Sequence, residues 1–311
     1  MKNNYKILYM GTSSFAVPSL KALKESGYNI PLVVTQPDRP KGRGCLITAP
    51  PVKEAALSLN LEVLQTESVK QNLFLEKMES LSPDFLIVAA FGHILPASVL
   101  KVPKIASLNI HGSILPKYRG PAPIQWAIIN GEKETGVTIM IMNEGLDTGD
   151  ILISSKTEIT SSDTSYTLSD KLSYMGADLL ISVLDNFPNL KPIPQDNSKF
   201  SYAPLFRKKD GCINWSKSAE EIDAFIRGVT PWPGAYTFHN KKLLKIFKAT
   251  PLEIEHNLTY GTILKSQKSE LCIAAGKGAI KVLELQGSSG KRLKTNEFLC
   301  GCKMPEGCVL R

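Results

Sequence analysis

The chain has 311 residues, of which 43% are hydrophobic and 21% charged, so one large globular domain or two moderate ones are expected. No run of about 18 apolar residues occurs, which excludes a membrane-spanning helix, and the first apolar run is too short for a secretory signal. Six cysteines without CxxC spacing do not suggest a disulfide framework, and we therefore expect a reducing, cytoplasmic location.

The net charge of +8 is concentrated in the last third of the chain. Residues 207–311 hold 18 Lys and Arg against 10 Asp and Glu, whereas residues 1–206 hold 19 of each. A neutral body with a basic appendage suggests a polyanionic partner. A solvated surface that keeps the protein soluble would explain the charge equally well.

The first half of the chain alternates short apolar runs with amphipathic stretches. This alternation predicts a Rossmann-like α/β domain, with a parallel sheet that carries helices on both faces. In such sheets, ligands bind beyond the carboxyl ends of the strands. The expected strands are 7–10, 31–35, 61–64 and 85–90, and the expected helices are 18–23, 51–59 and 73–81.

The pattern changes after a proline-rich segment at 186–196. We predict a catalytic domain at 1–187, a linker at 188–206 and a basic domain at 207–311. The last of these has one expected helix, 219–228, followed by short β-rich runs that predict a small OB-like β-barrel. Those runs are 235–239, 243–249, 259–265, 271–275 and 279–285.

A dinucleotide-binding motif would lie in the turn after the first strand. Gly11-Thr12-Ser13-Ser14 lacks the second glycine of GxGxxG, because Ser13 stands in its place. A strand-to-helix turn with a Ser or Thr cap is therefore favoured, and a nicotinamide oxidoreductase is disfavoured.

The densest chemical signal is the run Ser107–Pro123. Strand alternation places Asn109 and His111 on one face, about 6–7 Å apart along the strand. An amide and an imidazole side by side can bind one carbonyl, since the amide donates to its oxygen and the imidazole moves protons near neutral pH. A strand histidine alone is more often a hydrogen-bonded structural residue.

A second signal follows downstream, where an apolar strand at 136–142 leads into a glycine-bracketed acidic loop. Asp147 lies between Gly145 and Gly149, where it can reach a neighbouring strand end. A carboxylate near an imidazole orients the ring and stabilises its charged form. An Asx turn is the alternative use of such an aspartate.

Together, Asn-x-His-Gly-Ser-x-Leu-Pro, Gly-Val-Thr-Ile and Gly-Leu-Asp-Thr-Gly-Asp closely resemble the folate-dependent formyltransferase family. The resemblance implies formyl transfer from 10-formyltetrahydrofolate, a consumed co-substrate, to an amine, with no metal and with Asn109, His111 and Asp147 as catalytic residues. It also implies that folate contacts come from three segments. These are Phe91, Gly92, Ile94 and Leu95; Ser113, Ile114, Leu115 and Pro116; and Asn143, Glu144 and Gly145.

The acceptor amine is indicated by a polar, glycine-rich loop at 35–44. Its cations Arg39, Lys41 and Arg43 suit a phosphodiester ligand. The loop is similar to one in the tRNA-acting members of the family, which formylate methionine carried by initiator tRNA, and Arg43 aligns with their key arginine. The basic last third matches the tRNA-contacting, OB-like domain of those members.

Three alternatives stay open at this point. A sugar-nucleotide formyltransferase would share the three catalytic residues but lack the Arg39–Arg43 loop and the basic barrel. A 10-formyltetrahydrofolate hydrolase would use water in place of the amine. An inert RNA-binding module would not need Asn109, His111 and Asp147 together.

The final residues depart from the family pattern, because Cys300, Cys302 and Cys308 lie close together. A zinc site would want four ligands in recognisable pairs, so reduced thiols are expected. The family resemblance implies a monomer. The sequence assigns the three cysteines no role, and it does not show how initiator tRNA is told from elongator tRNA.

Overall fold

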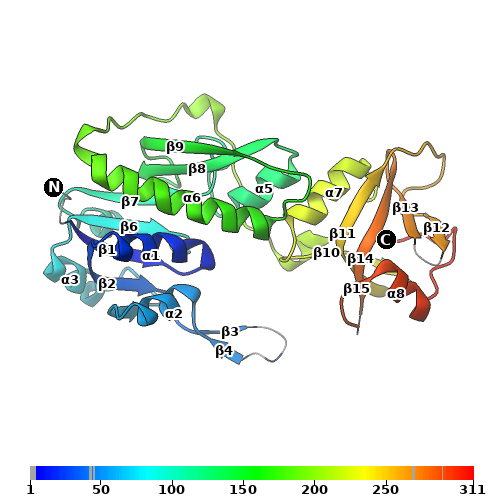
Figure 1. Cartoon of the computed structure of the whole chain (residues 1–311), viewed down its shortest axis with the longest axis horizontal. Helices are drawn as coiled ribbons and strands as arrows, with labels where there is room; N and C mark the ends of the chain where they lie inside the picture. Colours follow the sequence, from blue (N-terminus) through cyan, green and yellow to red (C-terminus); the bar gives the residue numbers. More distant parts are fainter. Residues whose placement is uncertain (1–4, 42–43, 45, 268–269, 289) are drawn as a thin grey trace. The chain divides into compact units, whose positions relative to one another are not determined.

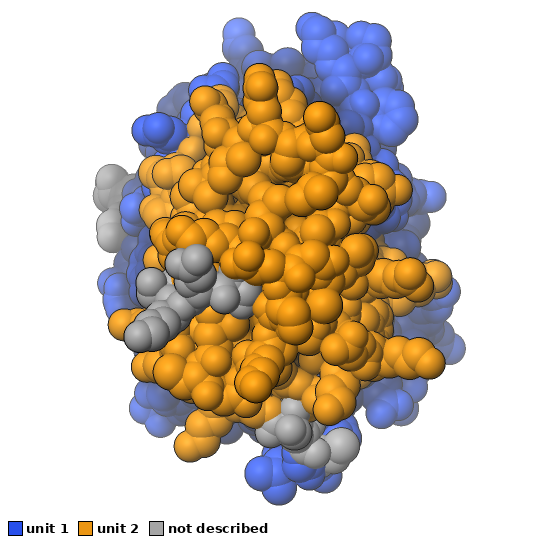
Figure 2. Space-filling view, turned by 90° about the vertical axis from the view of Figure 1, so that its right-hand side faces the viewer, with its two compact units in different colours: residues 1–123, 134–158, 169–204 blue, residues 124–133, 159–168, 205–311 orange. Residues whose placement is uncertain are grey.

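The computed structural model describes residues 5–41, 44, 46–267, 270–288 and 290–311. They form two compact units, shown as a cartoon in Figure 1 and coloured separately in Figure 2. The first unit comprises residues 1–123, 134–158 and 169–204, and the second comprises 124–133, 159–168 and 205–311. Every helix in the described ranges is too short or too polar to cross a membrane.

The first unit is built on a seven-stranded sheet in the order β5-β2-β1-β6-β7-β8-β9. The first five strands in this order, β5, β2, β1, β6 and β7, are parallel to one another, as predicted. Strands β8 and β9 are antiparallel to their neighbours. The strands are β1 (Lys6–Gly11), β2 (Asn29–Thr35), β5 (Val63–Gln65), β6 (Phe85–Ala89), β7 (Ala106–His111), β8 (Glu134–Ile141) and β9 (Ile151–Glu158).

Alternation along the apolar strands divides their side chains between two helical layers. Leu8, Leu86 and Val88 pack with Phe74 and Met78 of one layer. That layer contains α3 (Asn72–Leu81) and α4 (Ala97–Leu100), whose Val99 belongs to the same cluster. Helices α1 (Val17–Glu25) and α6 (Ser165–Asn186) cross the other face, as Figure 1 shows. The short helix α2 (Pro51–Ser58) packs beside α1.

Helix α6 passes close to the strands that carry the predicted site. A Cβ on Gly176 would lie 2.8 Å from the Ile110 side chain, so glycine permits this approach. Ile110 therefore faces α6, and its neighbours Asn109 and His111 face the opposite side of the sheet. Asn109 is in register with Val88 of β6, on the side of α3 and α4.

The opening turn departs from its expected capping. Ser13 precedes a short 3-10 helix, η1 (Ser14–Ala16), but its side chain makes no cap hydrogen bond. The Thr12 hydroxyl instead donates to the Phe91 carbonyl, 2.8 Å away. The turn was predicted correctly, and its cap was not, because a long-range acceptor takes the hydroxyl.

The second unit carries the predicted curled antiparallel sheet, in the order β10-β11-β14-β13-β12 with β15 beside β14. Its strands are β10 (Ala235–His239), β11 (Lys242–Leu252), β12 (Ile263–Gln267), β13 (Glu270–Ala274), β14 (Ala279–Gly287) and β15 (Leu293–Lys294). Helix α7 (Ala219–Gly228) begins at a capping box in which Ser218 and Glu221 bond reciprocally. Helix α8 (Thr295–Gly301) packs on β14.

The last residues of the chain bridge the two edge strands of this sheet. Phe238 of β10 exchanges backbone hydrogen bonds with Arg311, and Ile263 of β12 donates to the Cys308 carbonyl. Leu310 is only 2% exposed. The cysteine-rich terminal segment therefore completes the OB-like barrel, and the five cysteines described in the chain are free thiols.

Two short segments that precede residue 205, residues 124–133 and 159–168, belong to the second unit. Helix α5 (Pro123–Ile129) reaches α7 at Gly228, where a Cβ would lie 2.5 Å from the Ile129 side chain. The Trp126 ring stacks on Phe206 at 4.9 Å between centroids. The domain boundaries expected from sequence did not include this interleaving of the chain.

Segment 188–206, predicted as a linker, packs on the first unit for much of its length. Ile193 pairs with Ile151 of β9. Further along, Ser201 accepts from the Arg119 backbone N–H, and the Ala203 N–H donates to the Arg119 carbonyl. Two 3-10 turns, η2 (Phe187–Asn189) and η3 (Asn197–Lys199), interrupt the segment, and η4 (Lys208–Gly211) follows it.

Candidate active site

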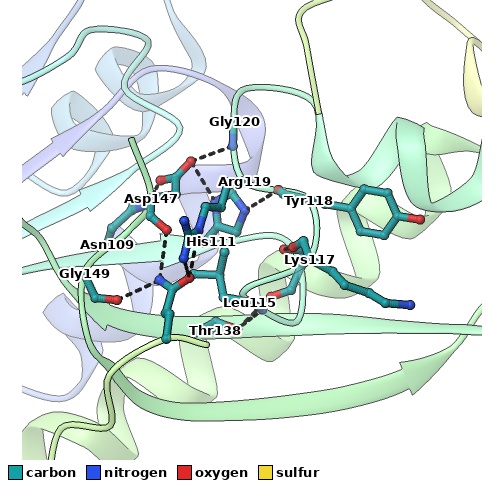
Figure 3. Close-up of polar contacts among 12 residues, drawn as sticks. Asn109, His111, Leu115, Lys117, Tyr118, Arg119, Gly120, Thr138, Asp147 and Gly149 are labelled. Carbon is teal, nitrogen blue, oxygen red and sulfur yellow. Dashed lines mark hydrogen bonds and ion pairs between the residues drawn. The ribbon is translucent and has the colours of Figure 1, made fainter. Parts of the chain in front are cut away.

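Three side chains selected from the sequence meet at the end of β7. Asn109 and His111 project from the same face of β7, and Asp147 lies on the loop between β8 and β9 (Figure 3). Asn109 Nδ2 donates to Asp147 Oδ1 at 3.3 Å, and His111 Nδ1 lies 3.7 Å from Asp147 Oδ2. The carboxylate therefore lies beside both the amide and the imidazole.

His111 is held from its other ring nitrogen. Its residue is 5% exposed, and Nε2 lies 2.9 Å from the Tyr118 carbonyl oxygen. A carbonyl only accepts hydrogen bonds, so Nε2 carries the proton of the neutral ring and Nδ1 presents its lone pair. When Nδ1 takes a proton, the Asp147 carboxylate stabilises the resulting charge through its field, because 3.7 Å is too long for a hydrogen bond.

Asp147 adopts an uncommon backbone conformation. Its φ of 52° lies in the left-handed region, which costs a non-glycine residue roughly 1–2 kcal/mol. A hydrogen bond from the loop after β7 helps to offset this cost, since the Gly120 N–H donates to Asp147 Oδ2 at 2.8 Å. Gly149 permits the turn, because a Cβ there would lie 1.7 Å from the Ile141 carbonyl oxygen. The Asp147 carboxylate thus accepts hydrogen bonds from Asn109 and Gly120, and it does not form the Asx turn that the sequence left as an alternative.

Polar groups of the loop itself and of β8 hold the first part of the loop after His111. The Ser113 hydroxyl is buried and donates to the Lys117 carbonyl, while Thr138 of β8 donates to the Ser113 carbonyl and accepts from the Leu115 N–H. Of the expected folate contacts here, Ser113 and Leu115 are buried, whereas Ile114 and Pro116 are partly exposed. The Ser113 side chain therefore supports the loop, and the exposed surface belongs to its neighbours.

The segment after β6 is also fastened at its backbone. The Phe91 carbonyl accepts from Thr12 and from Gln36 Nε2, and the Phe91 ring is buried. Gly92 has a φ of 87°. Ile94 is 73% exposed and Leu95 is buried, so only part of this predicted folate segment presents side chains to solvent.

The predicted folate residues before Asp147 form a turn of their own. Asn143 Oδ1 accepts from the Gly145 N–H at 3.1 Å and from the Thr148 hydroxyl at 2.8 Å, which is an Asx turn. Asn143, Glu144 and Gly145 are exposed. The turn shapes the loop that delivers Asp147 to the site.

The predicted tRNA loop is a hairpin in its described part. Strands β3 (Arg39–Lys41) and β4 (Leu46–Thr48) pair in antiparallel fashion, and Arg39 is exposed. Arg43 lies outside the described residues. The hairpin is fastened at its base by Asp38, which accepts from Lys53 and Gln65. The Lys53 ammonium and the Gln65 amide lower the pKa of the Asp38 carboxyl, so this anchor is charged at neutral pH.

Sequence reasoning missed two polar side chains beside the three selected ones. Arg119 is buried and donates to Gln195 and Asn197. Gln195 in turn donates to the carbonyls of Asp147 and Gly149. Arg119 lay within the densest motif and could have been singled out there, but nothing near Gln195 in sequence indicated a role.

The site combines an amide donor, an imidazole whose Nδ1 faces Asp147, and a carboxylate. This set suits acyl transfer, because the amide can hold a developing oxyanion while the imidazole carries a proton. Among the described residues, no group of three or more His, Cys, Asp and Glu is arranged to hold a metal ion.

The fold and the site define the class of protein. The family model for formyl transferase matches residues 4–184, and that for the formyl transferase C-terminal domain matches residues 206–303. The chain therefore belongs to the formyl transferase family.

Two methionyl-tRNA formyltransferases are similar to this chain over nearly its full length. The chain is 47% identical over 309 residues to the methionyl-tRNA formyltransferase of Caldanaerobacter subterraneus subsp. tengcongensis, covering 98% of this chain and 100% of that protein. It is 46% identical to the methionyl-tRNA formyltransferase of Acetivibrio thermocellus, covering 98% of this chain and 99% of that protein.

Solved structures share the fold at lower identity. An N-formyltransferase from Helicobacter canadensis, in complex with folinic acid and dTDP-3-aminofucose, has a TM-score of 0.66 and 22% identity, covering 91% of this chain and 99% of its own. HypX from Aquifex aeolicus with tetrahydrofolic acid has a TM-score of 0.65 and 19% identity, covering 99% of this chain. This chain spans about half (51%) of that HypX chain.

Proposed function

We propose that this protein transfers the formyl group of 10-formyltetrahydrofolate to the α-amino group of methionyl-tRNA, giving formylmethionyl-tRNA for translation initiation. The observation that carries the proposal is the meeting of Asn109, His111 and Asp147 in a chain that matches methionyl-tRNA formyltransferases over nearly its full length. Initiator tRNA is the proposed form of the acceptor.

The reaction exchanges one C–N bond for another. The neutral amine attacks the formyl carbon, and the carbonyl oxygen gains negative charge as the tetrahedral centre forms. One Asn109 Nδ2 hydrogen is engaged with Asp147, so the other is available to donate to this oxygen. Collapse of the centre breaks the bond from the formyl carbon to the folate nitrogen.

His111 is suited to move the proton that this exchange requires. The amine loses a proton when the new bond forms, and the departing folate nitrogen gains one. Nδ1 faces Asp147, so an imidazolium would have the Tyr118 carbonyl on one nitrogen and the carboxylate near the other. We propose that His111 carries this proton and that Asp147 stabilises the charged ring.

Folate is proposed to lie against the three exposed or partly exposed segments beside the site. These are Gly92 and Ile94, Ile114 and Pro116, and the Asn143–Gly145 turn. The buried members of the predicted set, Phe91, Leu95, Ser113 and Leu115, would support these surfaces from behind. The co-substrate supplies the formyl group and leaves as tetrahydrofolate.

Two basic features support tRNA as the carrier of the amine. Arg39 is exposed on the anchored β3–β4 hairpin, and Lys41 and Arg43 follow it in the sequence. Residues 207–311 hold 18 basic and 10 acidic side chains. Lysine and arginine bind phosphates largely without regard to base sequence, so these features would position the tRNA.

The test is an acceptor assay with four arms. The protein and 10-formyltetrahydrofolate are incubated with initiator methionyl-tRNA, methionine methyl ester, a dTDP-amino sugar, or no acceptor. We expect rapid formylation in the methionyl-tRNA arm and in no other arm. Turnover with the amino sugar but not with the tRNA would favour a sugar-nucleotide formyltransferase, and equal folate turnover without an acceptor would favour a hydrolase. Binding of tRNA with no turnover in any arm would favour an inert RNA-binding module.

We further propose that the protein acts in the cytoplasm, where initiator tRNA is charged and used. We also propose that it acts as a monomer. The five described cysteines are thiols, which suits a reducing compartment. Light scattering at assay concentration should give the mass of one chain, 34.1 kDa.

A further inference from the structure

Gln195 joins two loops of the first unit through one side-chain amide. Its Oε1 accepts from Arg119 Nε at 2.9 Å and from Arg119 Nη2 at 2.7 Å. Its Nε2 donates to the Asp147 carbonyl at 2.9 Å and to the Gly149 carbonyl at 2.7 Å. Both hydrogens and both lone pairs of the amide are therefore engaged.

The two loops that Gln195 joins are the ones that meet at the Asp147 carboxylate. Asp147 Oδ2 accepts from the N–H of Gly120, the residue next to Arg119. The backbone link through Gly120 and the side-chain link through Gln195 thus bracket the same carboxylate. Since Asp147 has a positive φ, its conformation depends on partners that hold its backbone from outside the loop.

The segment that carries Gln195 is itself fixed on both sides. Ile193 exchanges backbone hydrogen bonds with Ile151 of β9, and Asn197 accepts from Arg119 Nη2. Gln195 is partly buried, whereas the residues on either side of it are exposed. Its side chain therefore turns inward from an otherwise solvent-facing segment.

We propose that Gln195 is a positioning residue for formyl transfer, which holds the Asp147 carboxylate beside Asn109 and His111. This inference rests on the proposed function for its kinetic consequence, but the positioning itself is a property of the protein without substrates. It assigns a role at the active site to the segment between the two family-model matches, which end at residue 184 and resume at residue 206.

The kinetic test is a double-mutant cycle. Gln195→Ala should lower kcat roughly tenfold and change KM for either substrate less than about twofold, because a misplaced group affects the transition state more than binding. In the Asp147→Ala background, the same substitution should have almost no further effect on kcat, because both changes remove the same contribution, that of the positioned Asp147 carboxylate. Equal losses in the two backgrounds, or an unchanged kcat in the single variant, would overturn the proposal.

Two further variants complete the test. One separates the acceptor function of the Gln195 amide from its donor function, and the other is a control at the neighbouring position. Gln195→Glu keeps an acceptor for Arg119 but loses the donors to the Asp147 and Gly149 carbonyls, so its kcat should fall at least as far as that of Gln195→Ala. Wild-type kcat in Gln195→Glu would contradict the proposal. The matched control is Asp196→Ala, whose carboxylate contacts only Ser198 and Lys199 among the bonds described, and its kcat should be unchanged.

A measurement without turnover tests the same inference independently. The Gly120 amide donates to Asp147 Oδ2, so its hydrogen exchange reports where the carboxylate lies. Exchange at Gly120 in the free protein should accelerate severalfold in Gln195→Ala and in Asp147→Ala, and stay unchanged in Asp196→Ala. Unchanged exchange in Gln195→Ala would overturn the positioning role. If the wild-type protein showed no formyl transfer while the variants showed this exchange pattern, the proposed function would be contradicted. The positioning role of Gln195 would still hold.

Discussion

The Tyr118 carbonyl oxygen lies 2.9 Å from His111 Nε2, and this contact determines which nitrogen of His111 can take a proton. Because the carbonyl holds the Nε2 hydrogen, Nδ1 is the basic atom, and it is also the atom that faces Asp147 at 3.7 Å. The loop after β7 thereby orients the ring before any substrate arrives.

His111→Ala should lower the rate of formyl transfer on the order of a hundredfold or more, because it removes the proposed proton carrier. Single-turnover formylation of methionyl-tRNA measures this step directly. A matched unfolding curve for the variant would show that the fold is retained. A rate within twofold of wild type would remove His111 from the mechanism.

Asn109→Ala should also cost on the order of a hundredfold in kcat, because an oxyanion donor is lost. Asn109→Asp should cost more than Asn109→Ala, since it places a second carboxylate where Asn109 Nδ2 now donates to Asp147. Steady-state kinetics on both variants provide the comparison. If Asn109→Asp were the more active of the two, the proposed donor role would be wrong.

Arg39→Ala should raise KM for methionyl-tRNA severalfold and leave the slow hydrolysis of 10-formyltetrahydrofolate unchanged, because the exposed guanidinium is proposed to meet phosphate. The slope of log KM against log salt should also become shallower. Arg43→Ala should behave in the same way. Equal losses in tRNA formylation and folate hydrolysis would indicate a general defect in the first unit.

Glu270 links three strands of the second unit, because its carboxylate meets Lys265 of β12 and Lys281 of β14. Those two ammonium groups lower the pKa of Glu270 to about 2. A lowered carboxyl pKa stabilises the folded state above the unfolded value, near 4.5, and that stability is lost as pH falls through about 2. Glu270→Gln should therefore lower the unfolding midpoint at pH 6, and its difference from wild type should shrink towards pH 2. A difference independent of pH would contradict the electrostatic cause.

Leu310→Ala should destabilise the second unit by about 2–4 kcal/mol, since it leaves a cavity where the terminal segment bridges β10 and β12. Urea unfolding followed by tryptophan fluorescence would measure the change, because Trp126, Trp215 and Trp232 all belong to this unit. Val309→Ala is the matched control, because Val309 is 42% exposed and should cost much less. Equal costs would argue against a closing role for Leu310.

The sequence predicted the parts of the fold that depend on side-chain periodicity. The apolar runs of β1, β2 and β6 alternate between two helical layers, and the short strands after 230 form the expected curled sheet. The strand at β8 was predicted but its direction was not, because an antiparallel strand and a parallel one can carry the same pattern. Strand β9 was not predicted.

The candidate site was predicted to a similar extent. Asn109, His111 and Asp147 were singled out by residue type, spacing and the family resemblance, and the structure brings their side chains together. Their catalytic roles stay a prediction. Tyr118 and Gly120 contribute backbone atoms, which no residue type reveals. Gln195 acts from a segment 48 positions after Asp147, and such a pairing depends on the tertiary fold alone.

The interleaving of the two units restricts how such a protein can be recombined. Helix α5 precedes two strands of the first unit, yet it packs on Gly228 and places Trp126 on Phe206. A single crossover near residue 205 between two homologous genes would therefore join a new barrel to an inherited α5. Such chimaeras should fold well only when the α5 surface and its partner positions are exchanged together, so these two distant stretches of the gene are expected to diverge in step.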